Sequence, residues 1–131
     1  MRHLESRLQA ACVRWARLQF PECRKLLFAV PNGYRTSVTQ ARIAKEEGLV
    51  SGVADLLFLH PSADGNFAGL CIEFKTEKGR QSPNQKEWQR AIERTQIYRY
   101  EIVRTFGQFQ RLLTEHLCVV RCVNVDLVAQ K

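Results

Sequence analysis

The sequence predicts an α/β fold in which a mixed β-sheet is flanked by helices. Apolar residues recur at helical spacing in segments 4–18, 83–95 and 106–117, and short β-prone apolar runs lie between these segments. Two of the runs follow each other with only turn-forming residues between them. The order helix, strand, helix, strand, strand, helix, strand, helix needs both antiparallel and crossover connections, so the sheet is mixed. All of residues 1–131 are expected to form a single domain.

The N-terminal third is expected to form a helix, a strand and a second helix. The first helix ends before Pro21, and the strand 26–30 stops at a tight turn, Pro31-Asn32-Gly33. The second helix, 38–47, has few apolar residues and ends at Gly48, which suits a left-handed C-terminal cap. The apolar stripe of the first helix consists of Leu4, Leu8, Ala11, Cys12, Trp15 and Leu18.

A β-hairpin is expected in the middle of the chain. Segments 53–59 and 68–74 are apolar and β-prone, and the segment 60–66 between them is rich in turn formers. If the hairpin closes symmetrically about its turn, Asp55 lies opposite Glu73.

Charged side chains are expected to gather at the open end of this hairpin. Because side chains alternate along a strand, Glu73 and Lys75 share one face with Cys71, whereas Leu70, Ile72 and Phe74 share the other. Burying carboxylates without partners costs several kcal/mol, so Asp55 and Glu73 must pair internally or hold a ligand. A hard cation such as Mg²⁺ suits them, since one or two carboxylates with water and phosphate oxygens form its usual shell.

The C-terminal half is expected to form a helix, a strand and a last helix. Ser82 is a good N-cap, Pro83 suits the first helical position, and Gln85 completes a capping box. Segment 98–103 is β-prone, and 106–117 is an amphipathic helix with Phe109, Leu112 and Leu113 inward. The tail 117–128 is apolar and β-prone, which fits an added edge strand or a dimer contact. The inward stripe of the helix after Ser82 is Trp88, Ala91, Ile92 and Thr95.

Composition favours an intracellular protein that binds nucleic acid. Twenty Lys and Arg residues against 13 Asp and Glu give a net charge of +7 and a pI near 9.5. No apolar run approaches the roughly 18 residues that span a bilayer, and no signal peptide is evident. Five cysteines, an odd number, fit a reducing compartment. His116, Cys118 and Cys122 lack the spacing of a structural zinc site, so buried free thiols are preferred.

These motifs resemble the virus-type replication-repair nuclease (VRR-NUC) branch of the PD-(D/E)xK nucleases. The resemblance covers about residues 4–116 and implies a restriction-endonuclease-like core. The sequence departs from the family in two places: Ala54 stands where proline is usual, and Thr95-Gln96 stands where glycine is common before the strand. The resemblance is carried by Pro31-Asn32-Gly33, Gly48, Gly52-Val53-Ala54-Asp55, Ile72-Glu73-Phe74-Lys75, Lys78-Gly79-Arg80 and Ser82-Pro83-Asn84-Gln85.

The resemblance implies a metal-dependent, structure-selective DNA endonuclease that cuts branched DNA such as four-way junctions. It also implies that the protein acts as a homodimer and takes part in DNA repair, in the cytoplasm of a bacterium or a phage-infected host. Asp55 and Glu73 would bind Mg²⁺ or Mn²⁺ together with the Phe74 backbone carbonyl. Lys75 would orient the attacking water and stabilise developing charge. Glu5 is either a first-turn residue favoured by the helix dipole or, as the family implies, a residue that reaches the metal directly or through water. No small-molecule cofactor or membrane is expected.

Gln85 also has two interpretations. Its side chain caps its own helix, or it places its amide at the metal site as the family implies, and the second is preferred because an inward polar residue needs a partner.

Basic residues near the carboxylates are the expected DNA contacts. Lys78, Arg80 and Lys86 would hold backbone phosphates. Arg35 either adds positive charge at the entrance to the hairpin or is only part of a solvated surface. Asn32 either only forms its turn or, as the family implies, lies beside the active site. Two alternatives are a non-catalytic basic DNA-binding module and a restriction-type nuclease that reads specific bases. The second has less support, because no extra element is evident that could enter the major groove.

Overall fold

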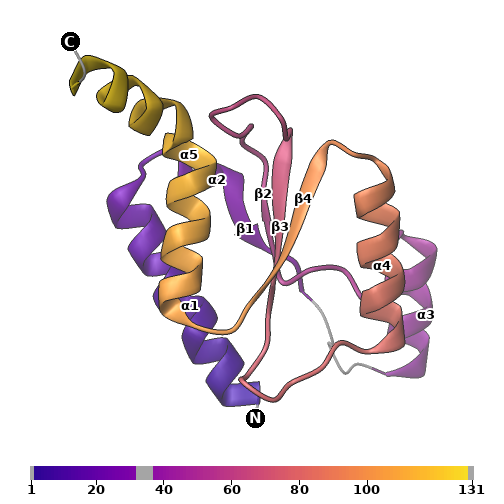
Figure 1. Cartoon of the computed structure of the whole chain (residues 1–131). Helices are drawn as coiled ribbons and strands as arrows, with labels where there is room; N and C mark the ends of the chain where they lie inside the picture. The colour runs from indigo at the N-terminus through magenta and orange to yellow at the C-terminus, as the bar shows by residue number, and fades with distance from the viewer. Residues whose placement is uncertain (1, 32–36, 130–131) are drawn as a thin grey trace.

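A four-stranded mixed β-sheet forms the centre of the described part of the chain (Figure 1). The computed structural model describes residues 2–31 and 37–129, and side chains of residues 3–31 and 37–118. Strands β1 and β2 pair antiparallel, as do β2 and β3, whereas β3 and β4 pair parallel. The predicted mixed sheet is therefore confirmed. The strands are β1 (Leu27–Ala29), β2 (Leu56–Phe58), β3 (Gly69–Phe74) and β4 (Tyr98–Val103), in that spatial order.

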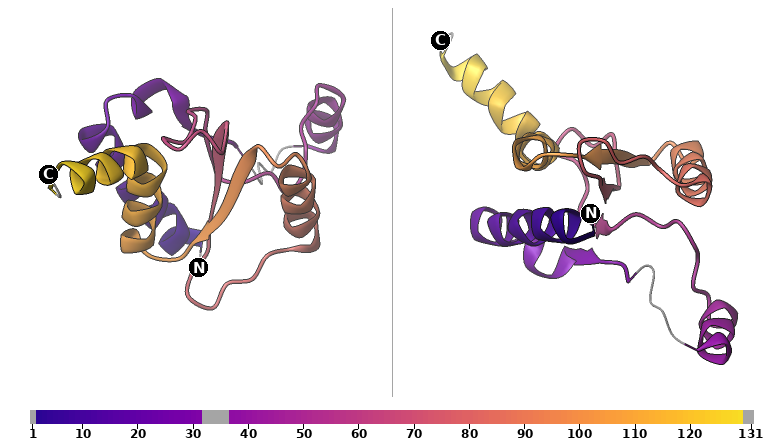
Figure 2. Two further views of the ribbon diagram at one scale, coloured as in Figure 1. Left: turned by 45° about the horizontal axis from the view of Figure 1, so that its top comes forward. Right: turned by 90° about the horizontal axis from the view of Figure 1, so that it is seen from below.

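Helices cover both faces of the sheet (Figure 2). Helices α1 and α5 pack against each other on one face, and α4 covers the other face, with α3 displaced to one side of α4 on that same side of the sheet. Because α4 connects the parallel strands β3 and β4, it provides the crossover that parallel pairing requires. The helices are α1 (Arg2–Gln19), α2 (Cys23–Leu26), α3 (Val38–Glu46), α4 (Pro83–Arg94) and α5 (Phe106–Ala129). The short α2 was not predicted.

The hairpin has the predicted register. Leu56 pairs with Ile72 and Phe58 pairs with Leu70, so the next position outward brings Asp55 opposite Glu73. The predicted left-handed cap at Gly48 is also present, with a φ of 107°.

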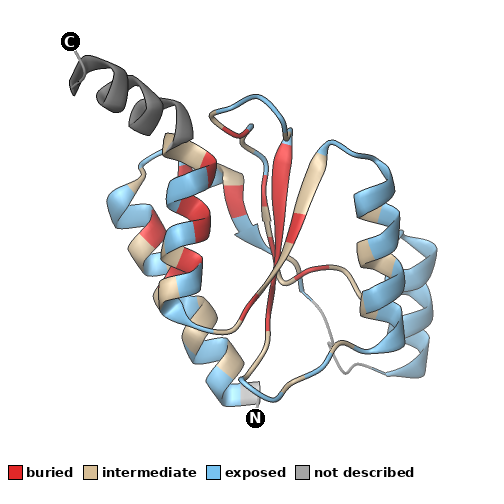
Figure 3. Ribbon diagram, in the orientation of Figure 1, coloured by how far each residue is buried: buried red, intermediate tan, exposed pale blue. Residues whose placement is uncertain are grey.

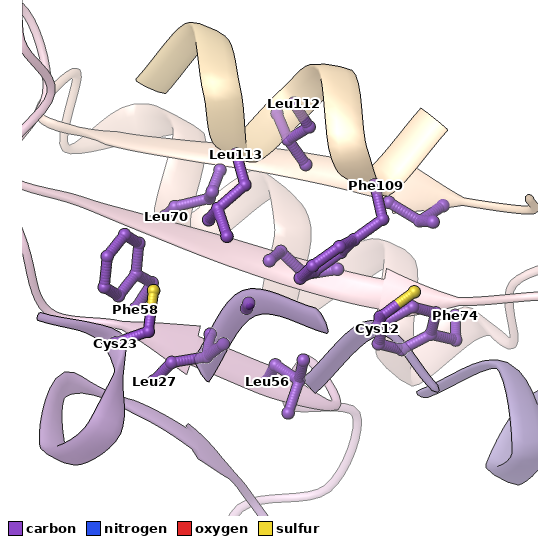
Figure 4. Packing of buried hydrophobic residues seen from close by; sticks show 13 residues of the cluster. Cys12, Cys23, Leu27, Leu56, Phe58, Leu70, Phe74, Phe109, Leu112 and Leu113 are labelled. Atoms are coloured by element: carbon purple, nitrogen blue, oxygen red, sulfur yellow. The ribbon is translucent and has the colours of Figure 1, made fainter. Parts of the chain in front are cut away.

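The two faces of β3 contribute to different apolar clusters, as the alternation predicts. Leu70, Ile72 and Phe74 pack with residues of α1 and α5 that include Cys12 and Phe109 (Figure 4). On the other face, Cys71 packs with Ala54, Tyr100 and the α4 residues Trp88 and Ile92. Every residue of β3 is buried (Figure 3). Glu73 therefore lies beneath α4, on the face of the sheet that carries the smaller apolar cluster.

Two of the predicted apolar stripes are only partly buried. Leu4 and Leu18 are 59% and 74% exposed, and Ala91 and Thr95 of α4 are exposed as well. An 18-residue helix is about 27 Å long, whereas a six-residue strand is only about 20 Å long. The ends of α1 therefore overhang the sheet, and periodicity alone does not reveal this.

The predicted edge strand in segment 117–128 is also wrong, because the backbone of α5 stays helical to Ala129. Gln108 accepts a hydrogen bond from Thr105 N and donates to Thr105 Oγ1, which makes a capping box at the start of this helix. A helix that has nucleated propagates cooperatively, and ordinary residues differ by at most about 0.7 kcal/mol in helix propensity. The β-propensity of residues 117–128 is too small to end the helix. The dimer contact stays a prediction.

Gln96 offers a simple test of backbone strain. Its φ is 63°, in the left-handed region that glycine adopts at little cost, and its N–H donates to the Glu93 carbonyl. We expect Gln96→Gly to raise the free energy of unfolding by about 0.5–1 kcal/mol. The control is Thr95→Gly, because Thr95 has an ordinary helical φ of −67° and the substitution should lower stability. Urea denaturation would measure both, and equal effects would contradict the expectation.

Candidate active site

Asp55 is fixed by the backbone on both sides of it. It directly precedes β2, its carbonyl accepts a hydrogen bond from Val30 N at 2.9 Å, and its Oδ2 accepts one from Phe74 N at 2.7 Å. The N–H and C=O of one residue in a strand point to the same side. The Phe74 carbonyl therefore also points toward Asp55, as its expected role requires.

Glu73 is fully buried, and in the part of the chain that the structure describes only one of its two carboxylate oxygens has a hydrogen bond. Its Oε1 accepts a hydrogen bond from the hydroxyl of Tyr100. Its Oε2 is buried and has no hydrogen-bond partner among the described residues. An unpartnered buried carboxylate oxygen is costly, so it indicates a position where a ligand binds.

Burial raises the pKa of both carboxyl groups. For Asp55, the hydrogen bond from Phe74 N and the charge of Lys75 oppose this rise, and the charge of Glu5 adds to it. For Glu73, the Tyr100 hydrogen bond and Lys75 oppose the rise, Asp55 adds to it, and the side chain of Gln81 opposes it more weakly. Lys75 is half-buried, and within the described residues it forms no ion pair, since the ion pairs found there join Arg99 to Glu101 and Glu115. The pair of carboxylates is therefore under-compensated by protein charge.

These oxygens fit a hard divalent cation. Asp55, Glu73 and the Phe74 carbonyl supply oxygen ligands, and a bound cation would offset the burial that raises the pKa of both carboxyl groups. The described residues contain no group of three His, Cys, Asp or Glu side chains placed to hold one ion together. Glu5 is nearby, with its Oε2 3.4 Å from Thr76 N. Its place at the metal, directly or through water, stays a prediction.

Gln85 caps its own helix. Its Oε1 accepts a hydrogen bond from Ser82 N at 2.8 Å, and Ser82 Oγ accepts one from Gln85 N at 3.2 Å, so the predicted capping box is present. Gln85 also lines a hollow of about 230 Å³ together with Asp55 and Lys45. The capping interpretation is confirmed, and the metal-site interpretation stays a prediction.

The loop between β3 and α4 carries the expected DNA contacts. Lys78 and Arg80 in the loop and Lys86 in the first turns of α4 are exposed. Arg104, which follows β4, holds this loop through three backbone carbonyls: its Nη1 donates to Thr76 O at 2.7 Å, Gly79 O at 2.8 Å and Glu77 O at 3.3 Å. Asn32 and Arg35 lie outside the described residues.

Tyr100 and Arg104 belong to the site but were not predicted from the sequence. Tyr100 pairs with Cys71 across β3 and β4, which places it on the face of Glu73. A register between two parallel strands joined by a helix leaves no local signal in the sequence. His116, by contrast, has a structural contact: it is buried, and its Nε2 lies 2.7 Å from the His60 carbonyl.

Comparison with known proteins identifies the family. The VRR-NUC domain family matches residues 1–106. The chain belongs to the VRR-NUC family. Solved structures of VRR-NUC domain proteins share the fold: one has a TM-score of 0.64 at 19% identity and covers 86% of each chain. Another has a TM-score of 0.52 at 23% identity and covers 86% of this chain and 96% of that one.

VRR-NUC membership makes this a protein of nuclease type, and the resemblance drawn from its motifs is confirmed. No significant match is found among curated proteins. None of the helices in the described residues is both long and apolar enough to cross a membrane.

Proposed function

We propose that this VRR-NUC protein is a metal-dependent DNA endonuclease that hydrolyses phosphodiester bonds with Mg²⁺ or Mn²⁺. The observation that carries the proposal is the buried, unpartnered Oε2 of Glu73, on a carboxylate set opposite Asp55 and beside Lys75. A divalent cation bound there would lower the pKa of water and neutralise charge on the scissile phosphate.

Each residue of the cluster has a distinct task in this proposal. Asp55 and Glu73 hold the cation, and the Phe74 carbonyl adds a neutral oxygen ligand. Lys75 orients the attacking water and donates hydrogen bonds to the phosphate oxygens as negative charge develops on them. The hydrogen bond from Phe74 N keeps Asp55 in place while these groups act.

The proposed substrate is branched DNA, including four-way junctions, and the proposed active form is a homodimer. Lys78, Arg80 and Lys86 are exposed beside the site and suit phosphate contacts, which position DNA without reading its sequence. Two copies would bring two active sites to a junction and allow symmetric cuts. A monomeric mass in solution would count against the dimer.

A cleavage assay tests the proposal. The purified protein is incubated with labelled four-way junction, flap, linear duplex and single-stranded DNA in Mg²⁺, Mn²⁺ or EDTA, beside Asp55→Ala and Lys75→Ala. We expect metal-dependent cutting of the junction that both substitutions abolish. DNA binding without cutting under every condition would support the non-catalytic binding module instead. Cutting that survives both substitutions would show that the catalytic residues lie elsewhere.

The salt dependence of DNA binding tests the basic residues. Each phosphate contact contributes about 0.9 to the slope of log affinity against log salt, so Lys78→Ala, Arg80→Ala and Lys86→Ala should each reduce the slope by about 1. Arg94→Ala is the matched control, because Arg94 is exposed at the opposite end of α4 from Lys86. Fluorescence anisotropy between 50 and 200 mM salt would measure the slopes. A loss of slope in the control alone would contradict this placement of the DNA.

A further inference from the structure

The hydroxyl of Tyr100 fixes one oxygen of the Glu73 carboxylate. Tyr100 lies in β4, is 6% exposed, and donates its hydroxyl hydrogen to Glu73 Oε1. The ring of Trp88 packs against that of Tyr100, with centroids 6.0 Å apart. A phenol held by packing and buried beside a carboxylate has little freedom to turn away.

Two glutamines set the direction of this hydrogen bond. Gln81 Nε2 donates to Gln89 Oε1 at 2.8 Å and to the Tyr100 hydroxyl oxygen at 3.4 Å. Because the amide of Gln81 acts as a donor toward Tyr100, the hydroxyl hydrogen remains available for Glu73. Gln81 lies in the loop between β3 and α4, and Gln89 lies on α4. The hydrogen bond to Gln89 on α4 therefore orients the Gln81 amide that donates to Tyr100.

From this geometry we propose that Tyr100 is a positioning residue for Glu73, holding Oε1 so that Oε2 is the one oxygen presented to the cation. The proposal rests on the metal-dependent function given above and adds a residue to it. Tyr100 does not touch the reacting atoms, and it acts only through the carboxylate. Without its hydroxyl, the carboxylate can rotate, and Oε1 becomes, like Oε2, a buried oxygen without a hydrogen-bond partner among the described residues of the metal-free protein.

The chain offers a close control for this role. Tyr98 lies two residues before Tyr100 on the same face of β4 and packs against the same apolar cluster. Within the described residues its hydroxyl has no hydrogen bond. Tyr98→Phe and Tyr100→Phe therefore remove the same atom from neighbouring positions, and only the second removes a contact with Glu73.

Calorimetric titration of Mn²⁺ into the metal-free protein tests the proposal without any DNA. Partners of metal ligands typically contribute 10–100-fold to affinity, so Tyr100→Phe should bind Mn²⁺ about 10–100-fold more weakly, with Tyr98→Phe unchanged. Cleavage by Tyr100→Phe should then need a higher Mn²⁺ concentration for half-maximal rate. Gln81→Leu removes the donor to the Tyr100 hydroxyl and the weaker interaction of Gln81 with Glu73, so it should also weaken Mn²⁺ binding but less, and it serves if Tyr100→Phe does not fold.

The outcomes separate this proposal from the proposed function. If the wild-type protein binds Mn²⁺ and Tyr100→Phe binds it equally well, Tyr100 is only a structural residue, even if its melting temperature falls. An equal loss in Tyr98→Phe would also overturn the positioning role. If the wild-type protein itself binds no Mn²⁺, the metal-dependent function fails, and the role of Tyr100 fails with it.

Discussion

Replacing Asp55 with asparagine is expected to abolish cleavage and to stabilise the metal-free protein. Loss of the carboxylate removes a ligand of the proposed cation, so the cleavage rate should fall at least about 1000-fold, as it does when a group that stabilises transition-state charge is lost. Burial raises the pKa of Asp55, which means that the ionised form is disfavoured in the folded state. Asparagine avoids that penalty and can still accept the hydrogen bond from Phe74 N.

The sign of the effect depends on pH. Above the raised pKa, Asp55 is ionised in both the folded and the unfolded chain, and the folded state carries the cost of the buried charge. Near neutral pH we therefore expect Asp55→Asn to raise the free energy of unfolding by about 1 kcal/mol, or the melting temperature by roughly 3–5 °C. As the pH falls below 3.8, the ordinary pKa of this carboxyl, both states are protonated and the gain should vanish.

Asp64→Asn is the matched control for stability. Hydrogen bonds from Ser62 and Asn66 lower the pKa of Asp64, so its ionised form is favoured in the folded protein, and its replacement should lower stability near neutral pH. Scanning calorimetry with and without Mn²⁺ would measure both variants. We expect Mn²⁺ to stabilise the wild-type protein and Asp64→Asn but not Asp55→Asn. Equal stabilisation of Asp55→Asn by Mn²⁺ would show that Asp55 is not a metal ligand.

The part of the site built from local sequence could be predicted. The opposition of Asp55 and Glu73 follows from the length of the hairpin turn and from alternation along the strands, and both are properties of contiguous segments. The capping box of Ser82 and Gln85 is likewise contained within one helical turn. The fold class followed for the same reason, because the period and order of the segments restrict the sheet to few arrangements.

The contacts that complete the site join segments far apart in the chain. Tyr100 reaches Glu73 through the register of two parallel strands, and Arg104 reaches the carbonyls of the loop after β3. Neither contact follows from residue spacing within a single helix or strand, so each depends on how the strands are arranged in the sheet. The predicted burial of both ends of α1 was wrong for a related reason, because the length of the sheet decides how much of the helix it covers.

Gly52→Ala is expected to destabilise the protein far more than any surface substitution. The φ of Gly52 is 86°, a conformation that costs an alanine roughly 1–2 kcal/mol. An added Cβ would also lie 2.8 Å from Gln85 N and closer still to the carbonyl of Asn84, so the backbone would have to move. Overpacking of this kind costs about 1–3 kcal/mol, and together the two effects should lower the free energy of unfolding by roughly 2–5 kcal/mol.

Gly48→Ala measures the cost of backbone strain without the steric overlap of an added Cβ. Gly48 also has a positive φ, 107°, but a Cβ there would meet nothing within 4 Å, so only the conformational cost of about 1–2 kcal/mol applies. Urea denaturation of both variants would give the difference, and equal losses would mean that the loop before Asp55 does not lie against the start of α4. The overlap also has a functional consequence, because relieving it moves this loop away from the helix that carries Gln85. Gly52→Ala should therefore lose cleavage activity even under conditions in which it remains folded, whereas folded Gly48→Ala should retain it.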